Sequence, residues 1–311
     1  FLILFFTTTA KAQKEAETFN VDSTLYEYYQ RCQEYLLEPV VLNMSDTLFR
    51  MAGERQDERM QAVAIATQLD YYYFQGTNED SVIHYTNKVK EFAKATHQPK
   101  YYYFAWANRL ITYYLKTSRT NIALYEVQNM LKEAQEEDDK TGLSRCYNIM
   151  SQIYTIKRFD SMAFEWRLKE IELTEKYKLE NYNISQTYAQ IANYYINQKK
   201  QKEALAAVEK AIATANSSTQ QISAKLEFVN YYSKFGDFQA AEKLLKECQA
   251  AFEQDKRLES IKKRLYNIEC LYYQQTKQYQ KALEAAKMQE KEERRLSESI
   301  LSSIHYRTQG E

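Results

Sequence analysis

Glycine and proline are scarce in this chain of 311 residues, which contains five glycines and two prolines. Both residue types mark turns, hairpins and sheet bulges, so a chain with so few of them has little material for a β-rich fold. Glu, Lys, Gln, Ala and Leu are abundant instead, and all five are good helix formers. The composition therefore predicts an all-helical protein, long enough for two average domains or one long array.

Catalytic and metal-binding signatures are also missing. None of the three histidines, His84, His97 and His305, has a Cys, Asp or Glu at a spacing typical of a metal site or a nucleophile–base pair. The glycines are scattered singly, which excludes a recognisable phosphate-binding loop. We therefore expect no catalytic residue, no metal and no cofactor, although the 42 acidic residues leave chance carboxylate pairs that the sequence alone does not exclude.

The chain has no excess of charge. Its 42 basic and 42 acidic residues are well mixed and give a formal net charge of zero. A nucleic-acid-binding protein needs a basic face to meet the phosphate backbone. We therefore expect no nucleic acid among its partners.

Cysteine is rare and shows no paired motif. Cys32, Cys146, Cys248 and Cys270 contain no C-x-x-C spacing and all fall on apolar helix faces, which favours buried free thiols. Cys248 and Cys270 fall on adjacent predicted helices, so a disulfide between them is the alternative in an oxidising compartment.

The first residues have the pattern of a secretory signal peptide. An apolar run, Phe1–Phe6, precedes the small-residue sequence Ala10-Lys11-Ala12 that a signal peptidase reads. Six apolar residues are too few to span a bilayer, which needs ~20, while the apolar end of a soluble helix remains an alternative. We expect residues 1–12 to be the end of a signal peptide, residues 13–21 to be a leader, and the mature chain to be exported.

The stretch from Gln186 to Asn216 carries the clearest pattern. Its apolar residues recur at spacings of three, four and seven, as in two amphipathic helices, with a polar break at Gln198–Gln201. Ala192 and Ala204 fall where the two backbones must approach closely, because a larger side chain would push the helices apart. The pattern predicts a closely packed helix pair.

This helix pair resembles a tetratricopeptide repeat (TPR). The residues that match the family pattern are Tyr188, Ile191, Ala192, Tyr195, Ala204, Val208 and Ala211. A second match contains Gly236-Asp237-Phe238 at the turn between its helices. The resemblance implies an all-α, right-handed superhelical solenoid of about seven TPR-like helix pairs over residues 22–295.

The predicted repeats are longer than the family average. The position that holds the first Ala of the second helix in the family pattern recurs every 37 to 42 residues, against a family period of ~34, at Val82, Ala123, Met162, Ala204, Ala241 and Ala282. Gly76 and Gly142 are expected to mark turns, and Pro99 to open a helix.

The resemblance also implies a ligand groove on the concave face, lined by the first helix of each pair. Carried over by repeat position, its residues are Tyr71, Phe74, Asn108, Thr112, Tyr147, Ser151, Tyr154, Asn193, Asn197, Asn230, Lys234, Arg264, Asn267 and Gln274. Asn and Tyr on rigid helices suit a protein or peptide partner, or a glycan, although a merely solvated face would look similar. A carboxylate clamp of the kind some TPR proteins contain is rejected, because its Lys position holds Ala189 and another polar position holds Glu227.

The last helix of the array is expected to continue without a break. No helix breaker stands between Gln278 and Gly310, and Leu296, Ile300, Leu301 and Ile304 form an apolar seam. Residues 296–311 are expected to be an exit helix, which either caps the last repeat or leads toward a membrane span beyond Glu311. A dimer through this helix is a further expectation.

Together these features resemble the extracytoplasmic sensor region of Bacteroidetes membrane regulators. The resemblance implies a non-catalytic, periplasmic ligand- or protein-binding TPR array in a two-component histidine kinase or membrane-bound transcriptional regulator. It also implies a tether to the inner membrane, made only by a segment downstream of this chain. The alternative is a freestanding periplasmic TPR scaffold or adaptor; an enzyme has no supporting residues.

Overall fold

The computed structural model describes residues 21–76, 78–179 and 183–308, with side chains described as far as Arg295. Every regular element within these ranges is a helix, which confirms the all-α prediction. The predicted signal peptide (1–12) and all but the last residue of the predicted leader (13–21) lie outside the described residues. The chain divides into two compact units, with the boundary between Phe159 and Asp160.

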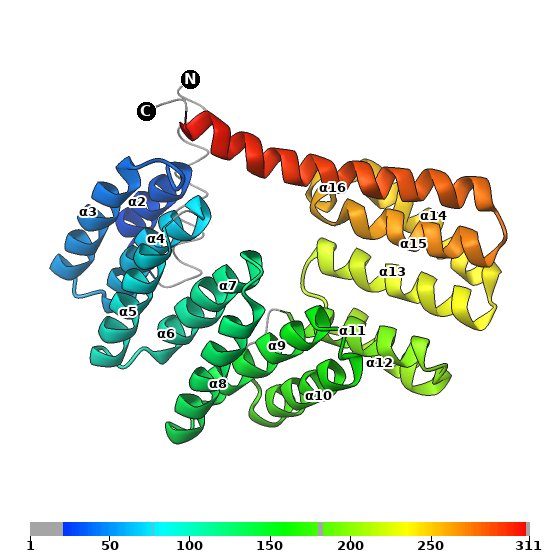
Figure 1. Ribbon diagram of the computed structural model, residues 1–311, viewed down its shortest axis with the longest axis horizontal. Coiled ribbons are helices and arrows are strands. Elements are labelled where there is room, and N and C mark those ends of the chain that lie inside the picture. The colour runs from blue at the N-terminus through cyan, green and yellow to red at the C-terminus, as the bar shows by residue number, and fades with distance from the viewer. Residues whose placement is uncertain (1–20, 77, 180–182, 309–311) are drawn as a thin grey trace. The chain divides into compact units, whose positions relative to one another are not determined.

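The first unit is built from paired helices that pack against their neighbours in chain order (Figure 1). Its elements are α2 (Ser23–Glu34), α3 (Val40–Glu54), α4 (Glu58–Gln75), α5 (Glu79–Ala95), α6 (Pro99–Ala105), the π-helix η1 (Trp106–Ile111), α7 (Thr112–Lys116), α8 (Thr120–Glu136) and α9 (Lys140–Ile156). The segments α6, η1 and α7 follow one another without a break and form one first helix.

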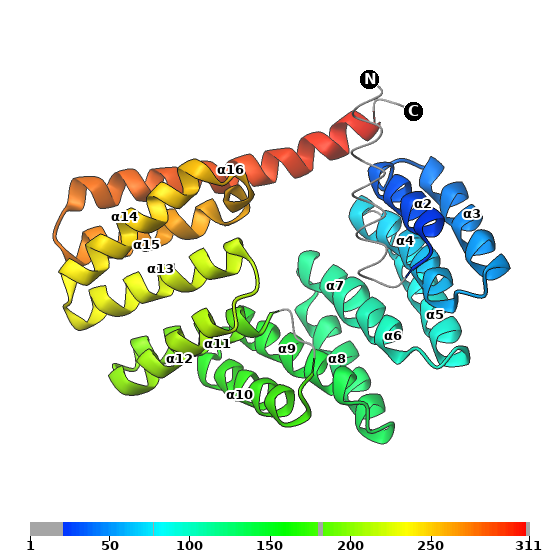
Figure 2. The same ribbon diagram turned by 180° about the vertical axis from the view of Figure 1, so that it is seen from behind.

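The second unit repeats the arrangement and is seen from both sides in Figures 1 and 2. Its elements are α10 (Asp160–Tyr177), α11 (Ile184–Asn197), α12 (Gln201–Ala213), α13 (Ser218–Phe235), α14 (Phe238–Gln254), the 3₁₀ helix η2 (Lys256–Ile261), α15 (Lys262–Gln275) and α16 (Tyr279–Thr308). The predicted break at Gln198–Gln201 and the unbroken last helix are both confirmed. None of the described helices is both long and apolar enough to cross a membrane.

Helix boundaries follow from capping residues that the sequence supplies. At the starts of six of the described α-helices, the side-chain oxygen of the N-cap residue accepts a hydrogen bond from a backbone N–H group; these residues are Asp22, Asp57, Asn78, Asp139, Ser217 and Asp237. Gly76 and Gly236 end α4 and α13 with φ of 70° and 89°, a left-handed conformation that glycine adopts without strain. These caps satisfy backbone groups that the helix itself leaves unpaired.

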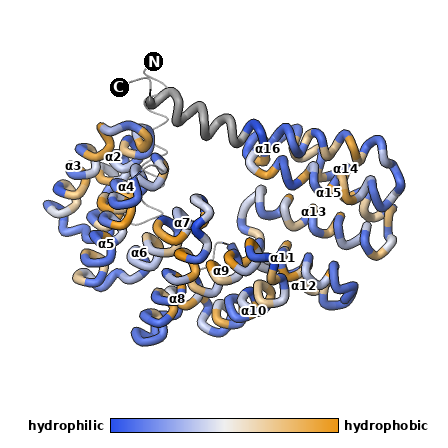
Figure 3. Tube along the Cα trace, viewed as in Figure 1, coloured by the Kyte–Doolittle hydropathy of each residue, from blue (hydrophilic) through white to orange (hydrophobic). Residues whose placement is uncertain are grey.

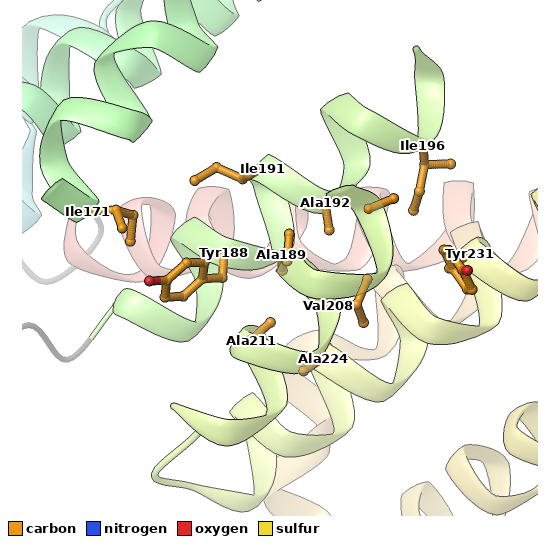
Figure 4. Close-up of a cluster of buried hydrophobic side chains, with 12 residues drawn as sticks. Ile171, Tyr188, Ala189, Ile191, Ala192, Ile196, Val208, Ala211, Ala224 and Tyr231 are labelled. Atoms are coloured by element: carbon orange, nitrogen blue, oxygen red, sulfur yellow. The ribbon is translucent and has the colours of Figure 1, made fainter. Parts of the chain in front are cut away.

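Alanines allow the helices of the second unit to pack closely. Ala192 on α11 and Ala204 and Ala211 on α12 are fully buried, within a cluster that includes Ile191 and Val208 (Figure 4). In the coloured parts of Figure 3, apolar residues are interspersed with polar ones along the helices, as expected when one face packs and the other is solvated. The predicted close approach at Ala192 and Ala204 is confirmed.

The family's first-Ala position on α10 was assigned one residue too early, to Met162. Met162 is 41% exposed, whereas Ala163 is 1% exposed and occupies the packed position on α10. A helix turns by about 100° per residue, so one step moves a side chain from the packed face to the surface.

Gly142 does not mark a turn, contrary to the expectation. It lies inside the first turn of α9, whose N-cap is Asp139, and it is buried. A Cβ atom on Gly142 would lie 2.7 Å from Cζ of Tyr103. The glycine is therefore needed for close packing of α9 against the Tyr103 ring on α6.

Gly142→Ala is expected to destabilise the protein by about 1–3 kcal/mol, because the rigid ring of Tyr103 cannot move aside without repacking. Gly53→Ala is the matched control, since its Cβ would meet only the end of the flexible Gln61 side chain. There alanine should be neutral or stabilise α3 by up to about 1 kcal/mol. Urea titrations of both variants check this, and equal gains in stability would contradict it.

The cysteines are all free thiols, so the alternative of a Cys248–Cys270 disulfide is not realised. The Cys270 sulfur accepts a hydrogen bond from Gln274 Nε2 at 3.3 Å. Burial raises the pKa of the Cys248 thiol to about 11, which keeps it protonated and unreactive near neutral pH.

Candidate functional site

The first helices of successive pairs contact one another in the first unit, and an ion pair joins two of them. Arg109 on η1 donates from Nη2 to Asp70 Oδ2 on α4 at 3.0 Å, and its Nε also donates to the same carboxylate. The two side chains are 16% and 17% exposed. Two parallel hydrogen bonds fix the orientation of the guanidinium plane.

Aromatic rings surround this ion pair. Arg109 Cζ lies 4.9 Å from the ring centroids of Tyr73 and Phe104 and 5.6 Å from that of Phe74. Lys116 Nζ on α7 lies 4.1 Å from the Tyr73 centroid. We call Asp70, Tyr73, Phe74, Phe104, Arg109 and Lys116 the Arg109 cluster.

A second arginine approaches the same cluster from α9. Arg145 Cζ lies 5.6 Å from the Phe104 centroid, and its buried Nε has no hydrogen-bond partner among the described residues. Burial lowers the pKa of Arg145 while nearby Asp139 opposes the shift, and the guanidinium stays charged in either case.

The Arg109 cluster and Arg145 together present more positive than negative charge. There are three cationic side chains, Arg109, Lys116 and Arg145, and two carboxylates: Asp70, which is paired with Arg109, and Asp139, whose charge acts on Arg145. Phe74 is 45% exposed and adds an accessible apolar face. The arrangement suits a carboxylate or another anionic group next to an apolar residue.

The π-helical segment η1 is a local departure from regular helix geometry within this first helix. It contains Arg109, and the Thr112 hydroxyl donates to the carbonyl of Ala107, five residues earlier, at 2.9 Å. Such segments occur often at functional sites. In this protein, the π-helical segment places the Arg109 guanidinium against Asp70 on α4.

Three of the seven predicted groove residues in this unit belong to or border the cluster. Phe74 is a member, the Asn108 carbonyl accepts a hydrogen bond from Arg109 Nη1 at 3.1 Å, and Thr112 holds the π-helical turn. Ser151 was predicted to line the groove, but its side chain is buried at 1% exposure and donates to the Asn148 carbonyl at 2.7 Å. A serine hydroxyl can satisfy itself on its own helix, so polarity alone did not make this position a groove residue.

The remaining predicted residues of the first unit are three tyrosines, Tyr71, Tyr147 and Tyr154. Tyr71 packs beside the apolar cluster of α2, α3 and α4, edge-on to Tyr72 at 5.0 Å between centroids. Tyr154 is half-buried and tilted against Phe159. Tyr147 is also half-buried.

In the second unit, the buried carboxylate of Glu227 contacts two of the predicted groove residues, Arg264 and Asn230. Glu227 on α13 accepts from Arg264 Nη2 at 2.6 Å and from Asn230 Nδ2 at 3.4 Å, with its side chain 7% exposed. A cleft of about 160 Å³ beside Arg264 is lined by residues that include Ser185, Ala189 and Ser223. Because Glu227 already neutralises Arg264, this arginine lacks the free charge that a carboxylate clamp requires.

Five further predicted groove residues of this unit are exposed on first helices. They are Asn193 and Asn197 on α11, Lys234 on α13, and Asn267 and Gln274 on α15. Exposure is compatible with a groove and with a solvated face, so these positions remain predictions.

Asp70, Arg109 and Lys116 are not among the groove residues predicted from the sequence. A usable signal was present, because Asp70 and Arg109 interrupt apolar and aromatic runs on predicted helices, and a charge on such a face needs a partner.

No group of three or more His, Cys, Asp or Glu side chains that could hold a metal occurs within the described ranges.

Comparisons with known proteins show what kind of fold this is. No protein-family profile matches the chain, and no curated protein sequence matches it. Among solved structures, the chain is similar to the apo form of RapI, with a TM-score of 0.59 and 14% identity over 88% of this chain and 99% of RapI. It is also similar to a Rap protein complexed with Competence and Sporulation Factor, with a TM-score of 0.55 and 12% identity over 89% of this chain and 76% of that protein.

A third similar structure is a STAND signal transduction ATPase with a tetratricopeptide repeat sensor from Pyrococcus horikoshii. The TM-score is 0.56 and the identity 15%, over 90% of this chain and 43% of the ATPase chain. The fold is TPR-like. At these identities the likeness concerns the TPR-like fold alone, so ligands and partners have to be argued from this chain's own residues.

Proposed function

We propose that this chain is a non-catalytic TPR-like array that binds a protein or peptide segment through the first-helix face of its first unit. The observation that carries the proposal is the Arg109 cluster with Arg145, where cations outnumber carboxylates beside the exposed Phe74. The preferred segment presents a carboxylate, from an Asp, a Glu or a chain end, next to an apolar side chain. The pair with Asp70 fixes the orientation of Arg109, while the ammonium of Lys116 and the unsatisfied Nε of Arg145 supply the groups that would bind the carboxylate.

The biological setting we propose is the extracytoplasmic sensor region of a two-component histidine kinase or membrane-bound regulator. The signal-peptide pattern at residues 1–12 and the continuous helix α16 support it. Ligand binding would bias the packing of neighbouring repeats, and α16 would carry that bias onward. A freestanding exported adaptor is the alternative, and the same binding face would serve it. A glycan ligand and a dimer through residues 296–311 are weaker proposals, because no contact among the described side chains favours either.

Lys116→Ala and Phe74→Ala are each expected to weaken peptide binding about 5- to 30-fold while leaving folding intact, since both side chains are exposed. The probe is a set of short fluorescent peptides with an apolar residue before a free C-terminal carboxylate, compared with their C-terminal amides in anisotropy titrations. Lys132→Ala on α8 and Phe238→Ala on α14 are matched controls with exposed side chains outside the cluster. Equal binding of acids and amides, or equal losses in the controls, would refute the proposed face.

The sensor and adaptor settings are separated by the DNA downstream of Glu311. An apolar run of ~20 codons followed by a kinase or DNA-binding module is expected for the sensor. A stop codon directly after this chain would instead support the adaptor.

A further inference from the structure

A cleft of about 230 Å³ lies in the first unit between α5, the α6–η1–α7 helix and α8. None of its lining residues belongs to the Arg109 cluster or to the groove predicted from the sequence. One wall is a stripe at four-residue spacing that includes Trp106, Leu110 and Tyr114. The wall is thus aromatic and apolar along its length, which is typical of a site for a small organic molecule.

Glu126 on α8 is the acidic group of this cleft. Its Oε2 accepts the Trp106 indole N–H at 2.9 Å, but it forms no ion pair with any described residue. Nearby Glu133 differs, because Lys90 and Lys94 both bind it and the Tyr102 hydroxyl donates to it at 2.8 Å. Glu126 is therefore oriented by the indole but left without a compensating positive charge.

Thr86 on α5 also lines this cleft, and its hydroxyl is an unsatisfied polar group. It is 3% exposed, and its hydroxyl has no hydrogen-bond partner among the described residues. Thr67 on α4 and Thr96 at the end of α5 instead donate to the carbonyl four residues earlier, and Thr174 on α10 is the other buried threonine hydroxyl without a partner among the described residues. A buried hydroxyl without a partner is destabilising, so a ligand group that meets it gains affinity.

The charges around the cleft are otherwise balanced or negative. The Lys90 ammonium lies 4.7 Å from the ring centroids of both Tyr102 and Trp106, and Glu133 compensates it at 2.9 Å. At the other end Arg119 is paired with Glu79 at 2.5 Å. Burial, followed by the charges of Glu79 and Glu126, raises the pKa of Tyr114 to about 12. The field at the cleft thus favours a cation.

We propose that this cleft is a second binding site, separate from the peptide-binding face, for a small organic ammonium ion with an apolar or aromatic body. The ammonium group binds the unpaired oxygen of Glu126, and its body lies against Trp106, Leu110 and Tyr114. The Thr86 hydroxyl supplies a further hydrogen bond. The proposal does not depend on the peptide-binding function.

The test uses phenethylamine as the probe and the fluorescence of Trp106 as the readout. Trp166→Phe removes the other tryptophan of the chain and leaves Trp106 as the sole reporter. Phenethylamine should change its emission saturably, and Glu126→Gln should weaken that binding at least about 10-fold while keeping an acceptor for the indole. Glu136→Gln, an exposed carboxylate on the same helix, is the matched control and should bind normally.

Two comparisons make the outcome decisive. Neutral phenethyl alcohol should bind at least about 10-fold more weakly than the amine, because only the ammonium uses the charge of Glu126. Thr86→Val should keep or raise the melting temperature and weaken amine binding several-fold. The proposal is overturned if amine and alcohol bind equally, if Glu126→Gln binds as the parent does, or if calorimetry and fluorescence detect no binding at millimolar amine.

Discussion

Ala192→Trp is expected to lower the free energy of unfolding by about 3 kcal/mol or more. Ala192 is fully buried and lies in the cluster that holds α11 to α12, with Ala204 and Val208 on the facing helix (Figure 4). An indole has no space there, so α11 and α12 must separate and lose contacts along both helices. The loss should also reach α13, which packs against both of them.

Ala206→Trp is the matched control, because Ala206 lies on α12 but is exposed. Thermal unfolding and hydrogen exchange of the two variants give the comparison. Ala192→Trp should speed exchange in α11 to α13 more than in the first unit, since stability in a repeat protein is largely a sum of neighbour contacts. A melting temperature unchanged by Ala192→Trp would contradict the packing described here.

Much of the fold was predictable because its determinants are local in sequence. A short window of sequence contains all that is needed to predict the turn at Gly76, the buried alanines of the helix pair around Ala192 and the polar break at Gln198–Gln201. Each depends only on the local backbone conformation or on the residues of one helix face. The predictions for Met162 and Gly142 were wrong, for two different reasons. The first error is a one-residue shift within a correctly predicted helix, and the second depends on Tyr103, a residue on a different helix.

The candidate site was less predictable, since its parts come from separate repeats. Repeat position selected Phe74, which the structure places in the Arg109 cluster, but it does not report the pairing between Asp70 and Arg109, which are 39 residues apart. It also missed the burial of Ser151. The pattern of apolar residues in the sequence contains no signal for the π-helical turn that carries Arg109.

The second large effect is expected at the ion pair of the Arg109 cluster. Asp70→Ala alone should destabilise the first unit by about 2–3 kcal/mol, somewhat below the range for fully buried pairs because both side chains keep some solvent contact. The guanidinium would then lie among three rings without a counter-charge. Arg109→Ala should cost a similar amount, because it strands the carboxylate and removes the cation from the faces of Tyr73 and Phe104.

A double-mutant cycle separates the ion pair from the ring contacts. The double variant should be about 1–3 kcal/mol more stable than the sum of the two single losses predicts, because removing both charges leaves no partly buried charge without a partner. The exposed pair Arg50–Glu54, at 3.6 Å, is the reference and should couple by no more than about 0.5 kcal/mol. If Asp70 and Arg109 couple no more than this reference, the rings alone hold Arg109. Its charge would then be available to a ligand, and Arg109→Ala should weaken acidic-peptide binding more than Lys116→Ala does.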